Sequence, residues 1–114
     1  VKKRRIIMDK LNAELEKFDV EQIKNIVFRF IYKHNLMDLK HHIARVAYYA
    51  MIVDSPAPKS KWELVHNIED LINEKNDLIF DLLDDDRVSS FDREKFNNEF
   101  NRYVSPLYHA AYDL

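Results

Sequence analysis

Two histidines of this chain share helical spacing with a carboxylate, a combination that can hold a metal ion. His34, Asp38 and His42 follow one another at intervals of four residues and would line one face of an unbroken helix. Asn35 interrupts that helix, because asparagine favours the left-handed turn at a helix end, and Arg45 would add a repelling cation. The sequence therefore predicts a capping histidine, polar surface residues, no metal ligands and no cofactor.

Arginine followed closely by histidine is a second pattern that could support catalysis. Arg29 is followed by His34, and Arg102 is followed by His109. This spacing resembles the motif of the HEPN ribonucleases, which are small all-α bundles, and the resemblance implies RNA cleavage that needs one of these histidines. No serine, histidine and carboxylate set stands out beside it. We therefore expect a protein that is not an enzyme and keep a ribonuclease as the third hypothesis.

Residues 61–84 carry the most ordered charge pattern of the chain. At about 100° per residue, their carboxylates fall close to one line, and their apolar side chains centre on the other side. Trp62 and Phe80 share one flank of that line, and interface hot spots are often aromatic. The pattern fits either a solvated helix face or a docking ridge for a basic partner protein. The predicted partner-binding residues are Trp62, Asp70, Glu74, Asp77, Phe80 and Asp81.

Charge is distributed unevenly along the chain, although the net charge is only −2. Residues 1–45 hold eleven Lys and Arg against six Asp and Glu, whereas residues 61–94 hold four against eleven. A basic N-terminal half could contact phosphate groups, so the alternative function is nucleic-acid binding in a regulator or a ribonucleoprotein. Folding could also bring the two halves together and neutralise them. The predicted nucleic-acid contacts are Lys2, Lys3, Arg4, Arg5 and Lys10.

The composition excludes several classes of site. The 114 residues contain no cysteine, which removes disulfides, thiolate metal sites and cysteine nucleophiles. They contain no glycine, which removes phosphate-binding loops and dinucleotide-binding turns and argues against hairpin-rich β structure. No apolar run approaches the roughly 20 residues that span a bilayer, and no secretory signal follows the charged start. We therefore expect one cytoplasmic domain over residues 1–114 without membrane contact.

Apolar periodicity and capping residues divide the chain into helices. Two prolines within residues 54–60 mark the one clear loop. Ser105 followed by Pro106 predicts a break and a short last helix, because proline fits the first position of a helix and not its interior. The predicted N-terminal caps are Asp19, Asn35 with Asp38, Ser60 and Ser105, and the pair Ser89 and Ser90 is predicted to open a helix. The predicted helices cover about residues 3–18, 20–34, 36–53, 61–84, 90–104 and 106–114.

These elements predict an all-α fold, a compact bundle of about five helices with a short sixth at the C-terminus. The helix expected over residues 36–53 is apolar almost all round near Tyr48 and Met51, as in a helix that is central or covered by a partner. Our first functional hypothesis is a small protein-interaction module, such as an inhibitor, an immunity or antitoxin-like factor, or an assembly subunit. Self-association as a homodimer stays open.

Overall fold

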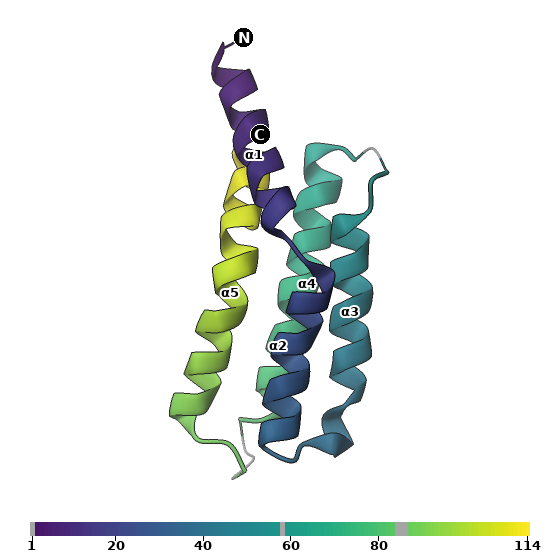
Figure 1. The fold of residues 1–114 in the computed structure, drawn as a ribbon, viewed down its shortest axis with the longest axis vertical. Coiled ribbons are helices and arrows are strands. Elements are labelled where there is room, and N and C mark those ends of the chain that lie inside the picture. The colour runs from purple at the N-terminus through teal and green to yellow at the C-terminus, as the bar shows by residue number, and fades with distance from the viewer. Residues whose placement is uncertain (1, 58, 84–86) are drawn as a thin grey trace.

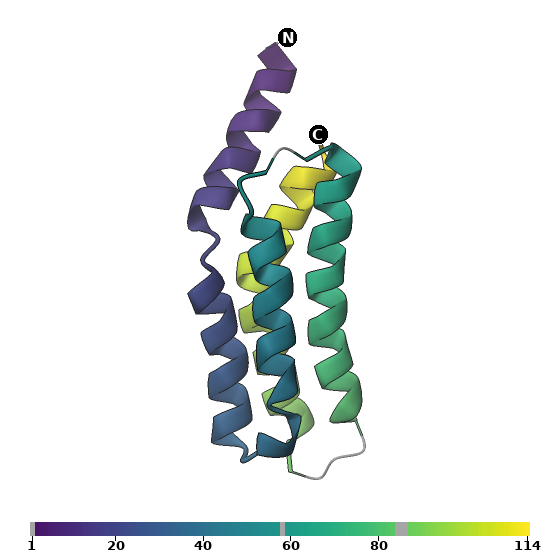
Figure 2. The ribbon, with the colours of Figure 1, turned by 90° about the vertical axis from the view of Figure 1, so that its right-hand side faces the viewer.

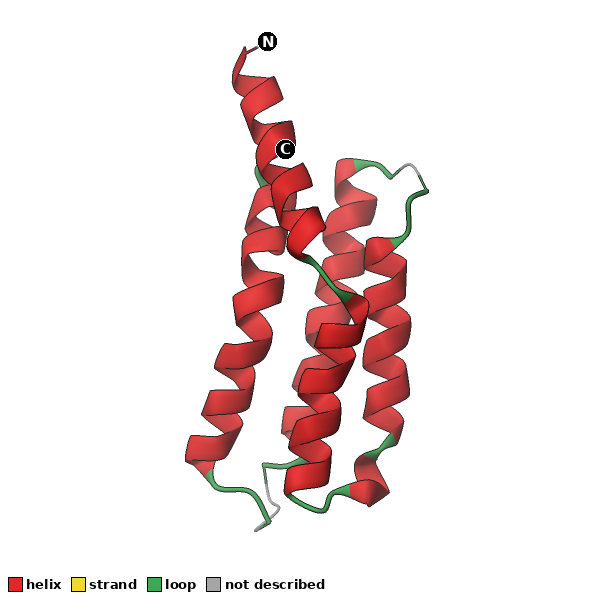
Figure 3. Ribbon diagram, in the orientation of Figure 1, coloured by secondary structure: helices red, strands yellow, loops and turns green. Residues whose placement is uncertain are grey.

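The computed structural model describes residues 2–57, 59–83 and 87–114, with side chains from Asp9 onwards. These residues are helical apart from short connections (Figure 3), which confirms the all-α fold of about five helices. No helix in the described ranges has the length and apolar character that a bilayer crossing requires. In chain order the elements are α1 (Lys2–Lys17), α2 (Val20–Lys33), the 3-10 helix η1 (Met37–Leu39), α3 (His41–Asp54), α4 (Lys61–Asp81) and α5 (Ser90–Tyr112).

Four of these helices form a bundle around one core. α2 packs against α3, α3 against α4, α4 against α5 and α5 against α2, so the four close a ring. α1 lies beyond the start of α2 along the long axis of the molecule and packs on α5 (Figures 1 and 2). The molecule measures 53 × 25 × 20 Å. All four helices of the ring supply fully buried side chains, among them Ile23, Ile31, Val46, Ile68, Leu71, Leu78, Phe100 and Leu107.

Polar side chains cap three helices at the predicted residues. Asp19, Ser60 and Ser89 each accept a hydrogen bond from a backbone N–H in the first turn of the following helix. Asn35 follows α2 with a φ of 56°, the left-handed conformation that a chain without glycine assigns to asparagine. These capping predictions are confirmed, and they set the starts of α2, α4 and α5 and the end of α2.

The connection from α2 to α3 differs from the prediction. The chain makes the 3-10 helix Met37–Leu39, and α3 begins only at His41. The prediction that Asn35 and Asp38 cap α3 is wrong, because Asp38 lies within the 3-10 helix. Its carboxylate instead accepts two hydrogen bonds, at 2.8 Å and 3.1 Å, from the guanidinium of Arg87. This paired contact fixes the turn against the segment that precedes α5.

α4 ends at Asp81, earlier than the predicted end near Asp84. Arg93 of α5 donates a hydrogen bond to the Leu82 carbonyl at 2.8 Å. A cation from a neighbouring helix therefore satisfies the C-terminal end of α4, where the helix dipole favours positive charge. The three aspartates 84–86, where that helix was predicted to end, lie outside the described residues.

Pro106 lies inside α5, so the predicted break and the short sixth helix are wrong. Ser105 is an interior residue of α5 and not a cap. The apolar face of α5 continues through the proline, with Val104 and Leu107 both fully buried. Each buried apolar side chain contributes about 1.5–3 kcal/mol, which offsets the roughly 3 kcal/mol that an interior proline costs. Pro106 and Arg102, one turn earlier, are both exposed, so the proline ring lies on the solvent side of α5.

Candidate functional site

Five of the six predicted partner-binding residues of α4 are exposed: Trp62, Asp70, Asp77, Phe80 and Asp81. Trp62 and Phe80 are 57% and 72% exposed, but eighteen residues separate them, which is about 27 Å along a helix. Trp62 packs edge-on against Tyr112 of α5, with ring centroids 6.1 Å apart, and so belongs to an aromatic group at one end of the bundle. Asp70 and Asp77 are exposed between the two aromatics. Partner binding by these five exposed residues stays a prediction.

Glu74 is buried, with 3% of its surface exposed, which removes it from the predicted exposed ridge. Its position on the helical wheel lies at the margin of the acidic line nearest the apolar side, and α3 covers that margin. There the Glu74 Oε1 atom lies 3.1 Å from Nε of Arg45 and 3.4 Å from Nδ1 of His42. The structure therefore gives Glu74 an internal ion-pair role between α3 and α4.

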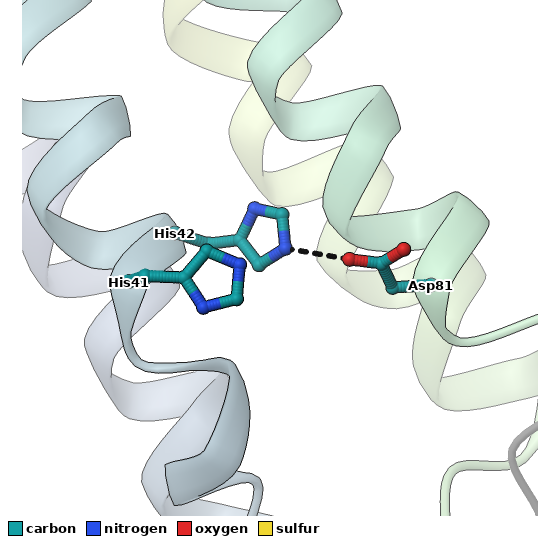
Figure 4. A group of neighbouring side chains, drawn as sticks. All are labelled: His41, His42 and Asp81. Carbon is teal, nitrogen blue, oxygen red and sulfur yellow. Dashed lines mark hydrogen bonds and ion pairs between the residues drawn. The ribbon is translucent and has the colours of Figure 1, made fainter.

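A polar cluster surrounds His42 at the contact between α3 and α4. The imidazole is 1% exposed, and its Nε2 atom lies 2.9 Å from Oδ2 of Asp81, the last residue of α4. His41 lies beside it, with ring centroids 4.3 Å apart. Figure 4 shows the two rings next to each other at the start of α3, with the Asp81 carboxylate reaching across from α4. The ligand atoms of His41, His42 and Asp81 lie within 4.8 Å of one another.

Lys75 is a second buried charged residue of α4 and faces α5. Its Nζ atom donates hydrogen bonds to Oδ1 of Asn97, at 2.5 Å, and to Oδ1 of Asn101, at 3.4 Å. The same atom lies 5.6 Å above the ring of Phe100. Burial lowers the pKa of the Lys75 ammonium below its ordinary value of 10.5. Because the amides and the ring satisfy this side chain internally, Lys75 serves the α4/α5 contact and not an open site.

An apolar groove of about 640 Å³ runs along the outward faces of α2 and α3. Tyr48 and Met51, on its α3 side, are 60% and 62% exposed. α3 is therefore a side helix of the ring that presents apolar residues to solvent, and not a central helix. Phe28 of α2 extends this surface by stacking on Tyr32, with ring centroids 5.9 Å apart. The groove is lined by Lys24, Phe28, Met37, Lys40, Ile43, Ala44, Ala47, Tyr48 and Met51.

The arginine and histidine pairs of the ribonuclease hypothesis lie in two places. Arg29 and His34 line one groove between α2 and α5, where Arg29 is ion-paired to Glu99 at 3.0 Å. Arg102 and His109 both lie exposed on α5, seven residues apart. Two helical turns, or about 10 Å, separate that second pair. Ribonuclease activity at either pair stays a prediction.

The predicted nucleic-acid contacts all belong to α1. Lys10 is exposed on that helix. Lys2, Lys3, Arg4 and Arg5 lie in its first turns, and their side chains are outside the described part of the structure. Nucleic-acid binding through these residues stays a prediction.

The cluster around His42 was not predicted from the sequence. Helical spacing placed His42 on a stripe with His34 and Asp38, whereas the carboxylate that contacts the ring is Asp81, thirty-nine positions along the chain. The apparent stripe is broken by the left-handed turn at Asn35. The predicted helices 36–53 and 61–84 did not place the histidine pair at a helix start or Asp81 at a helix end, so the contact between them had no local signal. No family model, curated protein or solved structure matches the chain.

Proposed function

We propose that the protein is a helical protein-interaction module that binds an apolar helix of a partner protein in the groove between α2 and α3. The observation that carries this proposal is the continuous apolar surface around Tyr48 and Met51. Large exposed apolar surfaces on small proteins mark interaction sites, and tyrosine and methionine are enriched in interfaces. A groove between two neighbouring helices, here α2 and α3, suits the apolar face of an amphipathic helix.

Charge narrows the chemistry of the partner. Among the described residues that line the groove, the charged ones are Lys24 and Lys40. A partner helix with acidic residues beside its apolar ridge complements these two ammonium groups. Such pairing orients the partner helix in the groove and raises the rate of association. Because salt screens these charges, binding should weaken as salt is added.

The test places a photo-crosslinking residue, benzoylphenylalanine, at three exposed positions of the full chain in its native lysate. Position 48 lies in the groove, position 80 lies on α4 beside the predicted acidic ridge, and position 91 is the control. Phe91 is 73% exposed, more than Tyr48, and lies outside the groove. We expect one protein adduct of defined mass from position 48 and none from position 91. The adduct should disappear when Met51→Glu is added.

The other outcomes contradict the proposal in distinguishable ways. An adduct from position 80 alone would favour the acidic face of α4, with Phe80 as an anchor. An adduct of twice the chain mass at position 48 would identify a homodimer. Loss of every adduct after nuclease treatment would favour the nucleic-acid hypothesis.

A further inference from the structure

We propose that His41, His42 and Asp81 form a binding site for a divalent metal ion of the zinc type. The site lies at the contact between α3 and α4, at the end of the bundle where α3 begins and α4 ends (Figures 1 and 4). It is independent of the partner-binding groove, which lies between α2 and α3. The argument rests on the positions of the three donors, on the hydrogen-bonding requirements of His42 and on charge.

The three donor groups are close enough to share one ion. Their ligand atoms lie within 4.8 Å of one another, and the ligands of a tetrahedral zinc ion lie about 3.3 Å apart, given bonds of roughly 2.0–2.2 Å. His42 is held by burial, whereas His41 is exposed and 43% of the Asp81 side chain is exposed. Rotation of these two exposed side chains can therefore bring their donor atoms to an ion at Nε2 of His42.

The surroundings of His42 supply the strongest observation. Its Nδ1 atom faces the buried carboxylate of Glu74, and its Nε2 atom faces the carboxylate of Asp81. A neutral imidazole has one N–H group and one lone pair, so it can donate to only one of these two acceptors. In either tautomer one ring lone pair faces a carboxylate oxygen. The Nδ1 lone pair faces Glu74 when Nε2–H donates to Asp81, and the Nε2 lone pair faces Asp81 when Nδ1–H points to Glu74. A cation shared by Nε2 and Asp81 turns that repulsive contact into a favourable one.

Glu74 occupies the place of the second partner of a metal-binding histidine, since its Oε1 atom lies 3.4 Å from Nδ1 of His42 and neither atom has a hydrogen-bond partner among the described residues. Such histidines almost always donate their other ring N–H to a carboxylate or carbonyl, which fixes the ring and the tautomer. Arg45 lies 3.1 Å from Glu74 and neutralises that carboxylate. The negative charge left to hold a metal ion is therefore that of Asp81.

Donor type and charge select the class of ion. Two imidazole nitrogens and one carboxylate suit zinc and its neighbours in the first transition row, whereas calcium and magnesium require a set of oxygen ligands. Three protein ligands leave the fourth tetrahedral position to water. Asp81 is also the last residue of α4, where the helix dipole attracts a cation.

The test is an isothermal titration in which zinc chloride is added to the tag-free, chelator-treated full chain and the heat of binding is measured. Cobalt(II), whose visible absorption reports coordination by nitrogen and oxygen, serves as a second probe. We expect one ion per chain. His41→Ala and Asp81→Asn should each weaken the affinity by roughly tenfold or more, since each removes one of three ligands.

His66→Ala is the matched control, because His66 is exposed on α4 and lies outside the cluster. It should bind zinc as the unaltered chain does. His41 is exposed, so His41→Ala should keep the helical circular dichroism and the melting temperature of the parent. Asp81→Asn keeps the shape of the side chain that contacts His42 and should keep the helical circular dichroism. The absence of saturable binding would show that a proton, and not a metal ion, bridges His42 and Asp81. If His66→Ala weakens zinc affinity as much as His41→Ala does, binding is spread over surface histidines. Either result overturns the proposal.

Discussion

The buried polar residues of the described chain, His42, Glu74 and Lys75, gather on α4 and on the face of α3 that meets it. Glu74 and Lys75 are neighbours in the sequence, but Glu74 contacts α3 and Lys75 contacts α5. A buried charge that loses its partner costs several kcal/mol. Rotation of α4 about its axis would separate Glu74 or Lys75 from its partners and incur this cost. These residues therefore fix the orientation of α4 between its neighbours more strictly than apolar packing does.

Lys75 gives a prediction about pH. Burial lowers its pKa in the native state, while in the unfolded chain the solvated ammonium titrates near 10.5. Between those two values the unfolded chain binds more protons than the native chain, so the free energy of unfolding should rise with pH across that interval. Urea unfolding at a series of pH values up to about 10.5 measures this rise.

Lys75→Met should abolish that part of the pH dependence, because methionine fills similar space without titrating. Lys95→Met is the control, since Lys95 is exposed on α5 and should leave the rise intact. If Lys75→Met and the parent chain show the same dependence, the ammonium is solvated in the native state.

At the scale of the elements, local sequence rules predicted most helix starts, but they could not predict features that depend on contacts between distant segments. Asp19, Ser60 and Ser89 cap helices within three residues of themselves, so their sequence neighbours suffice to identify them. Pro106 was misassigned because local propensity opposes a helix there, while the buried face of α5 lies against helices far along the chain. Propensity is a weak prior, and tertiary packing overrides it.

The candidate sites depend on such long-range contacts. The helical spacing of α4 identified its acidic residues but could not show that α3 covers Glu74. The same limit hid the approach of Asp81 to His42. The apolar character of α3 was visible in the sequence, whereas its place at the side of the ring, which opens the groove, required the structure.

Pro106 provides a prediction for α5. Pro106→Ala restores an N–H that can donate to the carbonyl of Arg102 and removes the steric conflict of the ring. We expect the free energy of unfolding to increase by about 1–3 kcal/mol, reduced by the greater freedom of the unfolded chain. Chemical denaturation measures the change.

Pro56→Ala is the comparison for Pro106→Ala, because Pro56 lies in the connection after α3 and not in a helix. It should give no increase in stability. An unchanged stability of Pro106→Ala would mean that water already satisfies the Arg102 carbonyl and that α5 bends without strain.

At the scale of the whole molecule, the basic and acidic halves of the sequence meet across helix contacts. Lys33 lies 4.0 Å from Asp92, Arg45 pairs with the buried Glu74, and Arg29 pairs with Glu99, which follows the acidic segment. The two pairs that are largely exposed, those of Lys33 and Arg29, contribute about 0–1 kcal/mol each, so they neutralise charge more than they stabilise the fold. The uneven charge of the sequence is thus partly neutralised in the folded molecule. The apolar groove, with Lys24 and Lys40, is then the better candidate for recognition than a charged face.

The packing of α1 on α5 joins the two ends of the chain and has a consequence for the order of folding. The contacts of α2 with α3, α3 with α4 and α4 with α5 link successive segments and can form early, whereas α1 must wait for α5. Leu11, a buried residue of α1, should therefore contribute after the rate-limiting step. In stopped-flow experiments, Leu11→Ala should speed unfolding by about thirtyfold for a loss of roughly 2 kcal/mol, with little change in the folding rate. Val46→Ala, in α3, should slow folding instead. Slower folding of Leu11→Ala would mean that the chain ends meet first.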